Sequence, residues 1–228
     1  TKCFITNAPI ADKITLFANT REGGGIRGLT VFLVDADTKG ISIGKEEDKM
    51  GIRASATAEI IFEDCFVPDS ALVGKEGRGF MIAMQTLQMS RPVVAAISVG
   101  IAQAAIEAAV AYSHHRKQFG VKIATFEMVQ QMIADMVMKT EAARILTYKA
   151  CVAQMNKDKK AGLYSAMSKC FASDTAMEVT TTAVQVMGGN GYSRENPVEK
   201  YMRDAKIMQI YEGTNQVQRL VIANETTF

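Results

Sequence analysis

Histidine is scarce in this 228-residue sequence, and the only two histidines are adjacent, His114 and His115. Successive residues of an α-helix are rotated by about 100°, so on a helix these two rings would point in different directions. Two imidazoles in that arrangement are a poor pair of ligands for one metal ion. The sequence therefore predicts no metal site.

Cysteine is also sparse, with Cys3, Cys65, Cys151 and Cys170 far apart in the chain. No C-x-x-C pair occurs, which excludes the common zinc and dithiol motifs. Unpaired cysteines at such spacings are typical of a reduced, intracellular protein.

Charge of one sign is not in excess, because the formal net charge is only +2. No basic footprint argues for nucleic acid. We also expect no apolar run of membrane-spanning length and no signal peptide. The sequence predicts neither a nucleic-acid nor a membrane partner. Because it opens directly on a strand pattern at residues 1–7, we expect an N-terminal portion of the protein to be missing.

Residues 1–74 carry short β-patterns separated by turns. Strands are predicted at residues 1–7, 13–19, 29–34, 41–43 and 57–67, and this spacing favours an antiparallel barrel or sandwich. Two glycine-rich stretches fail as phosphate loops. Residues 40–45 are one residue too short for a Walker loop, and residues 74–79 lack a surrounding βαβ unit, so we interpret the latter as a flexible link.

Residues 75–228 have helical periodicity. The first helix is expected from about Phe80, with Ser90 able to cap and Pro92 in a first turn, and to end at Phe119-Gly120. A second follows Thr125, and a third ends at Gly188. A shorter helix is expected from Pro197 to about Gln209, and a last segment follows Thr214. Long helices with short links predict an up-down four-helix bundle, so the fold class is α+β.

Residues 208–216 are the most informative stretch for chemistry. Glu212 lies on a Tyr-Glu-Gly-Thr turn between two helical patterns. Gly213 allows close backbone approach to a ligand, and Thr214 is a good N-cap. A carboxylate in an apolar pocket holds its proton more tightly, which suits abstraction of a proton from carbon. We interpret Glu212 as a general base; a solvated glutamate in a capping turn is the alternative.

Two further motifs allow a structural and a functional interpretation. The cations of residues 116–120 could simply stabilise a helix C-terminus, or Arg116 could bind a diphosphate with Phe119 packed on a flat ring. Residues 186–192 could be only a helix end, but three glycines exceed what one cap needs. The surplus indicates backbone approach to a ligand, with the Gln185 amide one turn away.

Taken together, these motifs strongly resemble those of the acyl-CoA dehydrogenase family. The resemblance rests on residues 4–7, 49–55, 62–64, 67–68, 77–80, 116–120, 185–191, 197–207 and 211–214. The segments follow the family's order over essentially the whole chain. The resemblance implies an incomplete middle β domain at residues 1–74 and a C-terminal four-helix-bundle domain at residues 75–228, without the N-terminal helical domain. The absence of that domain puts the activity of this fragment by itself in question.

The family resemblance also implies a reaction. Glu212 would remove the α-proton of an acyl-CoA thioester while a hydride leaves the β-carbon for flavin N5, giving the trans-2-enoyl-CoA. The thioester oxygen would accept a hydrogen bond from the backbone N–H of Glu212. The cofactor would be FAD, and reduced flavin would pass its electrons to an electron-transferring flavoprotein.

The resemblance assigns binding roles residue by residue. FAD contacts would come from Phe4, Thr6, Arg116, Gln118, Phe119, Phe126, Gln185, Gly188, Gly189, Thr214 and Gln216, some of them across a subunit interface. Substrate contacts would come from Gln88, Ser90, Arg91, Tyr211 and Gly213. Phe4 stands where many members have Trp, and Gln88 replaces an acidic residue of some medium-chain members.

Several alternatives remain open at this point. The same residues would serve an enoyl-CoA reductase running in reverse with the same partner, or a non-catalytic oligomerising fragment. An acyl-CoA oxidase is less favoured, because oxidases usually carry a further C-terminal domain. A DNA-binding relative is also less favoured, because that branch carries an extra basic helical domain. The family implies a homotetramer, a dimer of dimers, in fatty acid β-oxidation. It would be cytoplasmic in a bacterium or in the mitochondrial matrix of a eukaryote. Acyl chain length is not encoded in the residues considered.

Overall fold

The structure is a computed structural model that describes residues 1–227. These form two compact units, Thr1–Thr86 and a second unit from Leu87 onward. The division falls within helix α1 (Gly79–His115), which begins in the first unit. The predicted domain boundary after residue 74 stays a prediction, and each unit is described by itself.

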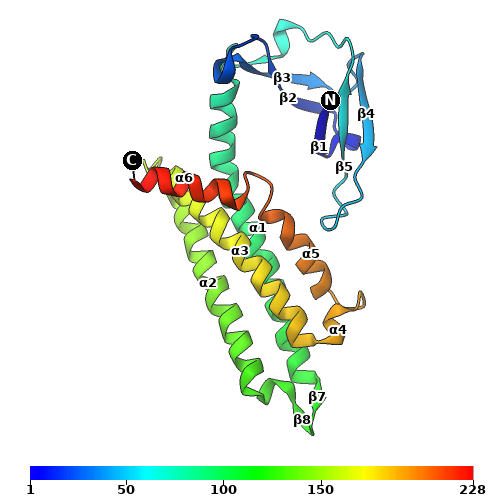
Figure 1. Cartoon of the computed structure of the whole chain (residues 1–228), viewed down its shortest axis with the longest axis vertical. Helices are drawn as coiled ribbons and strands as arrows, with labels where there is room; N and C mark the ends of the chain where they lie inside the picture. The colour runs from blue at the N-terminus through cyan, green and yellow to red at the C-terminus, as the bar shows by residue number, and fades with distance from the viewer. Residues whose placement is uncertain (228) are drawn as a thin grey trace. The chain divides into compact units, whose positions relative to one another are not determined.

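The first unit consists of two three-stranded antiparallel sheets (Figure 1). One has the order β1-β5-β4 and the other the order β2-β3-β6. The strands are β1 (Lys2–Thr6), β2 (Lys13–Asn19), β3 (Leu29–Asp35), β4 (Ile41–Glu46), β5 (Thr57–Phe62) and β6 (Leu72–Val73). Alternate residues of paired strands, such as Ile14 opposite Val34, are buried in one apolar core. The prediction of a small antiparallel β unit is confirmed.

Residues 74–79, which we expected to be a flexible link, pack against β3. The Gly77 N–H donates a 3.0 Å hydrogen bond to Thr30 Oγ1. A Cβ on Gly77 would lie 2.5 Å from the Arg27 carbonyl oxygen, and φ at Gly77 is +73°. Glycine is therefore needed here for close approach of two backbone segments, and the interpretation as a link was wrong.

The second unit is helical, and its long helices run side by side (Figure 1). After α1 it contains α2 (Glu127–Met155), α3 (Ala161–Met187), α4 (Gly189–Tyr192), α5 (Val198–Met208) and α6 (Asn215–Thr227). A short hairpin, β7 (Lys117–Gln118) and β8 (Val121–Lys122), joins α1 to α2. Small side chains such as Ala105 and Ala176 fill the common core of α1, α2 and α3. The predicted helical bundle is confirmed; the hairpin was not predicted.

Helix α1 begins at Gly79, close to the predicted start at about Phe80, but Pro92 lies inside it, so the prediction of Ser90 as a cap and Pro92 in a first turn was wrong. Proline has no N–H to donate to the carbonyl four residues earlier, which is that of Gln88. The Gln88 carbonyl oxygen instead accepts a 3.0 Å hydrogen bond from Gln154 Nε2 on α2. A side chain of the neighbouring helix thus replaces the missing backbone bond, and the helix continues.

Helix α1 is long and apolar enough to cross a membrane by length and composition, so the expectation of no such run was wrong. The buried core helix of a helical bundle can have the same length and composition. Within the part of the chain that the structure describes, 44% of the apolar window is already buried against the protein.

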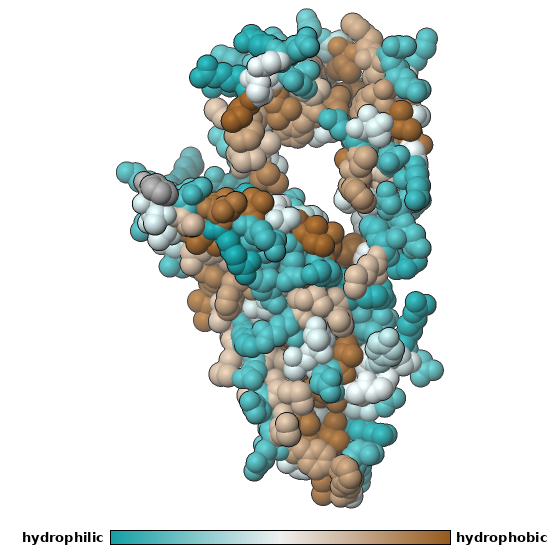
Figure 2. All heavy atoms as spheres, viewed as in Figure 1, coloured by the Kyte–Doolittle hydropathy of each residue, from teal (hydrophilic) through white to brown (hydrophobic). Residues whose placement is uncertain are grey.

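Hydrophobic side chains also gather on the surface of the helical unit, notably along α6 (Figure 2). Val217 and Leu220 on α6 are 45% and 64% exposed. On α2, Ile145, Val152 and Met155 are exposed as well. Exposed apolar side chains grouped on one element are typical of surfaces that contact another protein.

Candidate functional site

Glu212 lies on the turn between α5 and α6, and its backbone is in the left-handed region. Its φ is +58°, and the next residue, Gly213, has φ +87°. A non-glycine residue with positive φ is uncommon and costs free energy, so the surrounding structure must hold it there. Thr214 Oγ1 accepts a 3.3 Å bond from the Val217 N–H, which confirms its predicted role as the N-cap of α6.

The Glu212 side chain is half-buried and has polar neighbours from α1. Ser90 Oγ donates a 2.5 Å hydrogen bond to Glu212 Oε2. The adjacent Arg91 is buried, and its Nε has no hydrogen-bond partner among the described residues. Burial lowers the pKa of Arg91, while the charge of Glu212 opposes that change. Burial, followed by the charge of Glu212, raises the pKa of Tyr211. The carboxylate therefore lies among polar groups, whereas the sequence suggested an apolar pocket.

Lys169 on α3 lies beneath this turn. It is fully buried, and its Nζ donates hydrogen bonds to the Gly213 carbonyl oxygen at 2.8 Å and to Asn215 Oδ1 at 2.9 Å. Burial lowers the pKa of Lys169 to about 8. Gln218 Nε2 donates to the carbonyl oxygens of Glu212 and Gly213 at 3.2 and 3.1 Å. The turn is thus held from α3 and from α6.

Asp174, five residues after Lys169 on α3, connects the same elements. Its carboxylate accepts hydrogen bonds from Gln209 Nε2 at 2.6 Å, Arg219 at 2.6 Å and Asn215 Nδ2 at 2.7 Å. Burial raises the pKa of Asp174, but these three donors outweigh it and leave the pKa lowered. Because Gln209 precedes the turn and Asn215 follows it, Asp174 fixes both ends of the Glu212 turn.

Lys169, Asp174 and Gln218 were not predicted from the sequence to belong to the site. One signal was available for Lys169, which stands three residues after Ala166 and four before Ser173 on a face otherwise filled by small residues. A lysine on an apolar helix face is uncommon, because lysine is almost never fully buried unless it is paired.

Most of the predicted cofactor residues lie at another end of the helical unit. Asn190 Nδ2 donates a 2.6 Å bond to the Tyr112 hydroxyl, and the Arg116 N–H bonds the Tyr112 carbonyl. This places the β7–β8 hairpin and the start of α4 close together (Figure 1). Arg116, Gln118, Phe119, Gln185, Gly188 and Gly189 are all exposed. The rings of Phe119 and Phe126 meet edge to face with centroids 6.2 Å apart, and Phe119 is 94% exposed.

The other predicted residues are distributed over both units. Phe4 and Thr6 are exposed on β1, where Phe4 has φ +56° at a break in the strand register. Gln216 is exposed in the first turn of α6. The carbonyl of Gln88 is occupied by Gln154, as described above. No structural observation assigns these residues a ligand, so their roles stay predictions.

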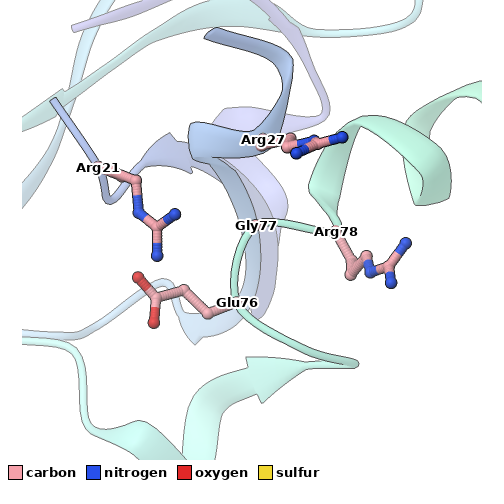
Figure 3. Close-up of a pocket in the computed structure, with 5 residues that line it drawn as sticks. All are labelled: Arg21, Arg27, Glu76, Gly77 and Arg78. Atoms are coloured by element: carbon pink, nitrogen blue, oxygen red, sulfur yellow. The ribbon is translucent and has the colours of Figure 1, made fainter. Parts of the chain in front are cut away.

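The first unit has a separate pocket of about 350 Å³, lined by Arg21, Arg27, Glu76, Gly77 and Arg78 (Figure 3). Three guanidinium groups against one carboxylate could bind an anion. None of the residues predicted from the sequence to bind cofactor or substrate lines this pocket. Across residues 1–227, no group of three or more His, Cys, Asp or Glu side chains could hold a metal ion.

Two family models match the chain in succession. Residues 1–65 match the acyl-CoA dehydrogenase middle domain, and residues 77–226 match the acyl-CoA dehydrogenase C-terminal domain. The chain belongs to the acyl-CoA dehydrogenase family. The resemblance that the sequence motifs indicated is therefore confirmed, and so is the α+β fold class.

Individual family members are close in sequence and in structure. The probable acyl-CoA dehydrogenase FadE25 of Mycobacterium tuberculosis is 50% identical over 97% of this chain and 57% of its own length. Butyryl-CoA dehydrogenase from Megasphaera elsdenii is 49% identical, with a TM-score of 0.95 over 98% of this chain and 58% of its own. A structure described as the electron transferring flavoprotein of Acidaminococcus fermentans is 52% identical, with a TM-score of 0.96 over 99% and 59%. The chain thus spans somewhat over half the length of each of these three proteins.

Proposed function

We propose that the chain is the β and C-terminal helical portion of an FAD-dependent acyl-CoA dehydrogenase, with Glu212 as its general base. The product would be the trans-2-enoyl-CoA. The observation that carries the proposal is the geometry at Glu212, a carboxylate held at positive φ with its oxygen 2.5 Å from Ser90 Oγ. Backbone strain of this kind persists where the surrounding structure enforces it, which is common at catalytic positions.

The chain's own groups would act as follows. Glu212 would accept the proton from the carbon next to the thioester, and the Ser90 hydroxyl would hold the carboxylate in one rotamer. The backbone N–H of Glu212 would polarise the thioester oxygen where negative charge develops. The buried Arg91 guanidinium contributes positive charge close to the same carboxylate. Together these groups would allow the Glu212 carboxylate to remove a proton from carbon.

The residues at the hairpin end suit a dinucleotide. A Cβ on Gly188 or Gly189 would have no atom within 4 Å, so the backbone there is open to approach. The Arg116 guanidinium is exposed and could hold a diphosphate, and the exposed Phe119 ring could stack on a flat ring system. When bound, FAD supplies the acceptor for the hydride that leaves the β-carbon.

The length of helix α1 indicates that one flavin cannot contact both the Glu212 turn and the β7–β8 hairpin of the same chain. Arg116 follows Ser90 by 26 residues on and just beyond α1, or about 39 Å at 1.5 Å per residue. That separation exceeds the length of an extended FAD molecule. We infer that the hairpin end serves a flavin whose base belongs to another subunit, which requires at least a dimer. The exposed apolar side chains of α2 and α6 would suit such interfaces, in line with the expected homotetramer.

The electron acceptor proposed for the reduced flavin is an electron-transferring flavoprotein. Support comes from the similar structure that is described as the electron transferring flavoprotein of Acidaminococcus fermentans. The same groups would catalyse reduction of an enoyl-CoA, and direction depends on the potential of the electron donor.

The test uses a chimera in which the upstream part of Megasphaera elsdenii butyryl-CoA dehydrogenase is joined to Thr1 of this chain. We expect a yellow protein that bleaches when butyryl-CoA is added without oxygen. Glu212→Gln should keep FAD and lose bleaching. A chimera that binds FAD but does not bleach would refute the dehydrogenase proposal, and a colourless oligomer would favour a non-catalytic assembly module.

A further inference from the structure

Lys169 is the largest of the fully buried side chains in the described part of the chain. Transfer of an ammonium from water to a protein interior is costly, and lysine is almost never fully buried unless it is paired. The apolar neighbours of Lys169 on α3, such as Ala166 and Ala172, have no such cost. The position of Lys169 therefore needs an explanation beyond packing.

The two hydrogen-bond acceptors of the Lys169 ammonium belong to the segment that carries Glu212. Lys169 Nζ donates to the Gly213 carbonyl oxygen at 2.8 Å and to Asn215 Oδ1 at 2.9 Å. Gly213 directly follows the strained residue, and Asn215 begins α6. A single cation on α3 thus holds both the end of the turn and the start of the next helix.

Each acceptor has a second donor within hydrogen-bond distance. The Gly213 carbonyl also accepts from Gln218 Nε2 at 3.1 Å, and Asn215 Oδ1 also accepts from Ser173 Oγ at 3.2 Å. A methionine of similar length would fill the space without the desolvation cost, and replacement of a buried charge by an apolar side chain is often neutral. Stability alone therefore does not account for a lysine here.

We propose that Lys169 is a positioning residue that holds the Glu212 turn in its strained conformation and keeps the carboxylate beside Ser90. The inference rests on the proposed role of Glu212 as the base. It requires the ammonium form, because only the charged group makes strong hydrogen bonds to both acceptors. The charged or titratable groups that act on Lys169 are Cys170, Asp174, Arg91 and Glu212.

The first test needs no activity and uses the 228-residue chain. Amide hydrogen exchange is measured for residues 212–215 in the wild type and in Lys169→Met. We expect exchange there to be about tenfold faster or more in Lys169→Met, the factor that corresponds to loss of a charged hydrogen bond. Exchange in the core of α2 should be unchanged. Equal exchange at residues 212–215 in both proteins would overturn the proposal.

The second test uses the chimera described above. Lys169→Met should lower kcat about 100-fold, the effect of a misplaced catalytic group, while KM changes by less than about threefold. Lys139→Met is the matched control, because Lys139 forms an exposed ion pair with Glu178 on the surface of α2 and α3. It should keep wild-type kcat. Equal losses in the two variants, or a loss confined to KM, would contradict a positioning role.

A third test needs only the wild-type protein and therefore remains possible if Lys169→Met does not fold. Above pH 8 the ammonium of Lys169 loses its proton, so exchange at residues 212–215 should rise more steeply with pH than the intrinsic base-catalysed rate. Exchange that follows only the intrinsic rate would overturn the proposal. If the wild-type chimera proves inactive, the proposed function fails, but both exchange measurements still decide the role of Lys169.

Discussion

Ser90 on α1 and Glu212 on the turn before α6 are 122 residues apart in sequence, yet Ser90 Oγ donates a 2.5 Å hydrogen bond to Glu212 Oε2. A hydroxyl that donates to a carboxylate holds that side chain in one rotamer. The bond therefore joins the helix expected to carry substrate contacts to the residue expected to act as the base.

We predict that Ser90→Ala in the chimera lowers kcat/KM about tenfold, because the carboxylate loses a charge-assisted hydrogen bond. Steady-state kinetics with butyryl-CoA measure this. Ser98→Ala is the control, since Ser98 is buried on the same helix and donates to the Val94 carbonyl of its own helix. Wild-type kinetics in Ser90→Ala would show that the bond does not serve the reaction.

Stability should depend on pH through Lys169 in the alkaline range. Its pKa is lowered from 10.5 to about 8, so between these values the unfolded chain binds more protons than the folded chain. Stability therefore rises with pH in this window, and the cost of the buried ammonium is full only below pH 8.

The measurement is urea unfolding of the wild type and Lys169→Met at pH 8 and pH 10. The free energy of unfolding of the wild type, minus that of the variant, should rise by about 2 kcal/mol between the two pH values. Cys170 and Tyr211 titrate in both proteins and largely cancel in the difference. A difference that is independent of pH would contradict the lowered pKa.

Local patterns in the sequence predicted local structure well. Gly188, at φ +58°, ends α3 where the glycine-rich stretch indicated, and Thr214 caps α6. The short strands of the first unit pair antiparallel, as their spacing indicated. In each case the determining contacts lie within a few residues, or the pattern repeats along one strand.

What the sequence did not predict depends on contacts between distant segments. Pro92 is tolerated inside α1 only because Gln154, 62 residues later, bonds the orphaned Gln88 carbonyl. Ser90 looked like a helix cap because its partner, Glu212, is far away in the chain. The role of Lys169 could not be predicted without knowing that α3 lies under the Glu212 turn, where Lys169 bonds the Gly213 carbonyl. Such pairings follow from tertiary packing and leave no local periodicity.

Alanine substitutions at Gly188 and Gly189 distinguish a glycine needed for its backbone conformation from one needed for ligand binding. Gly188→Ala should destabilise the chain by roughly 1–3 kcal/mol, since φ +58° with ψ −137° is strained for alanine. Gly189→Ala should change stability by less than about 0.5 kcal/mol, because Gly189 has no positive φ and open space at its Cβ.

Thermal unfolding of the chain measures the stability of both variants. Titration of the chimera with FAD measures whether Gly189 contributes to cofactor binding. We expect Gly189→Ala to weaken FAD binding although its stability is unchanged. Wild-type FAD affinity in Gly189→Ala would remove Gly189 from the predicted cofactor site.

The most direct test of Glu212 as the base measures proton removal from the substrate without hydride transfer. The chimera with FAD is incubated in D₂O with an acyl-CoA analogue that has sulfur in place of the β-carbon, so that no hydride can leave, and deuterium uptake at the carbon next to the thioester is followed by mass spectrometry. We predict that Glu212→Gln exchanges about 10²–10⁴-fold more slowly than the wild type, the usual contribution of a general base. Exchange at the wild-type rate in Glu212→Gln would show that another group removes the proton.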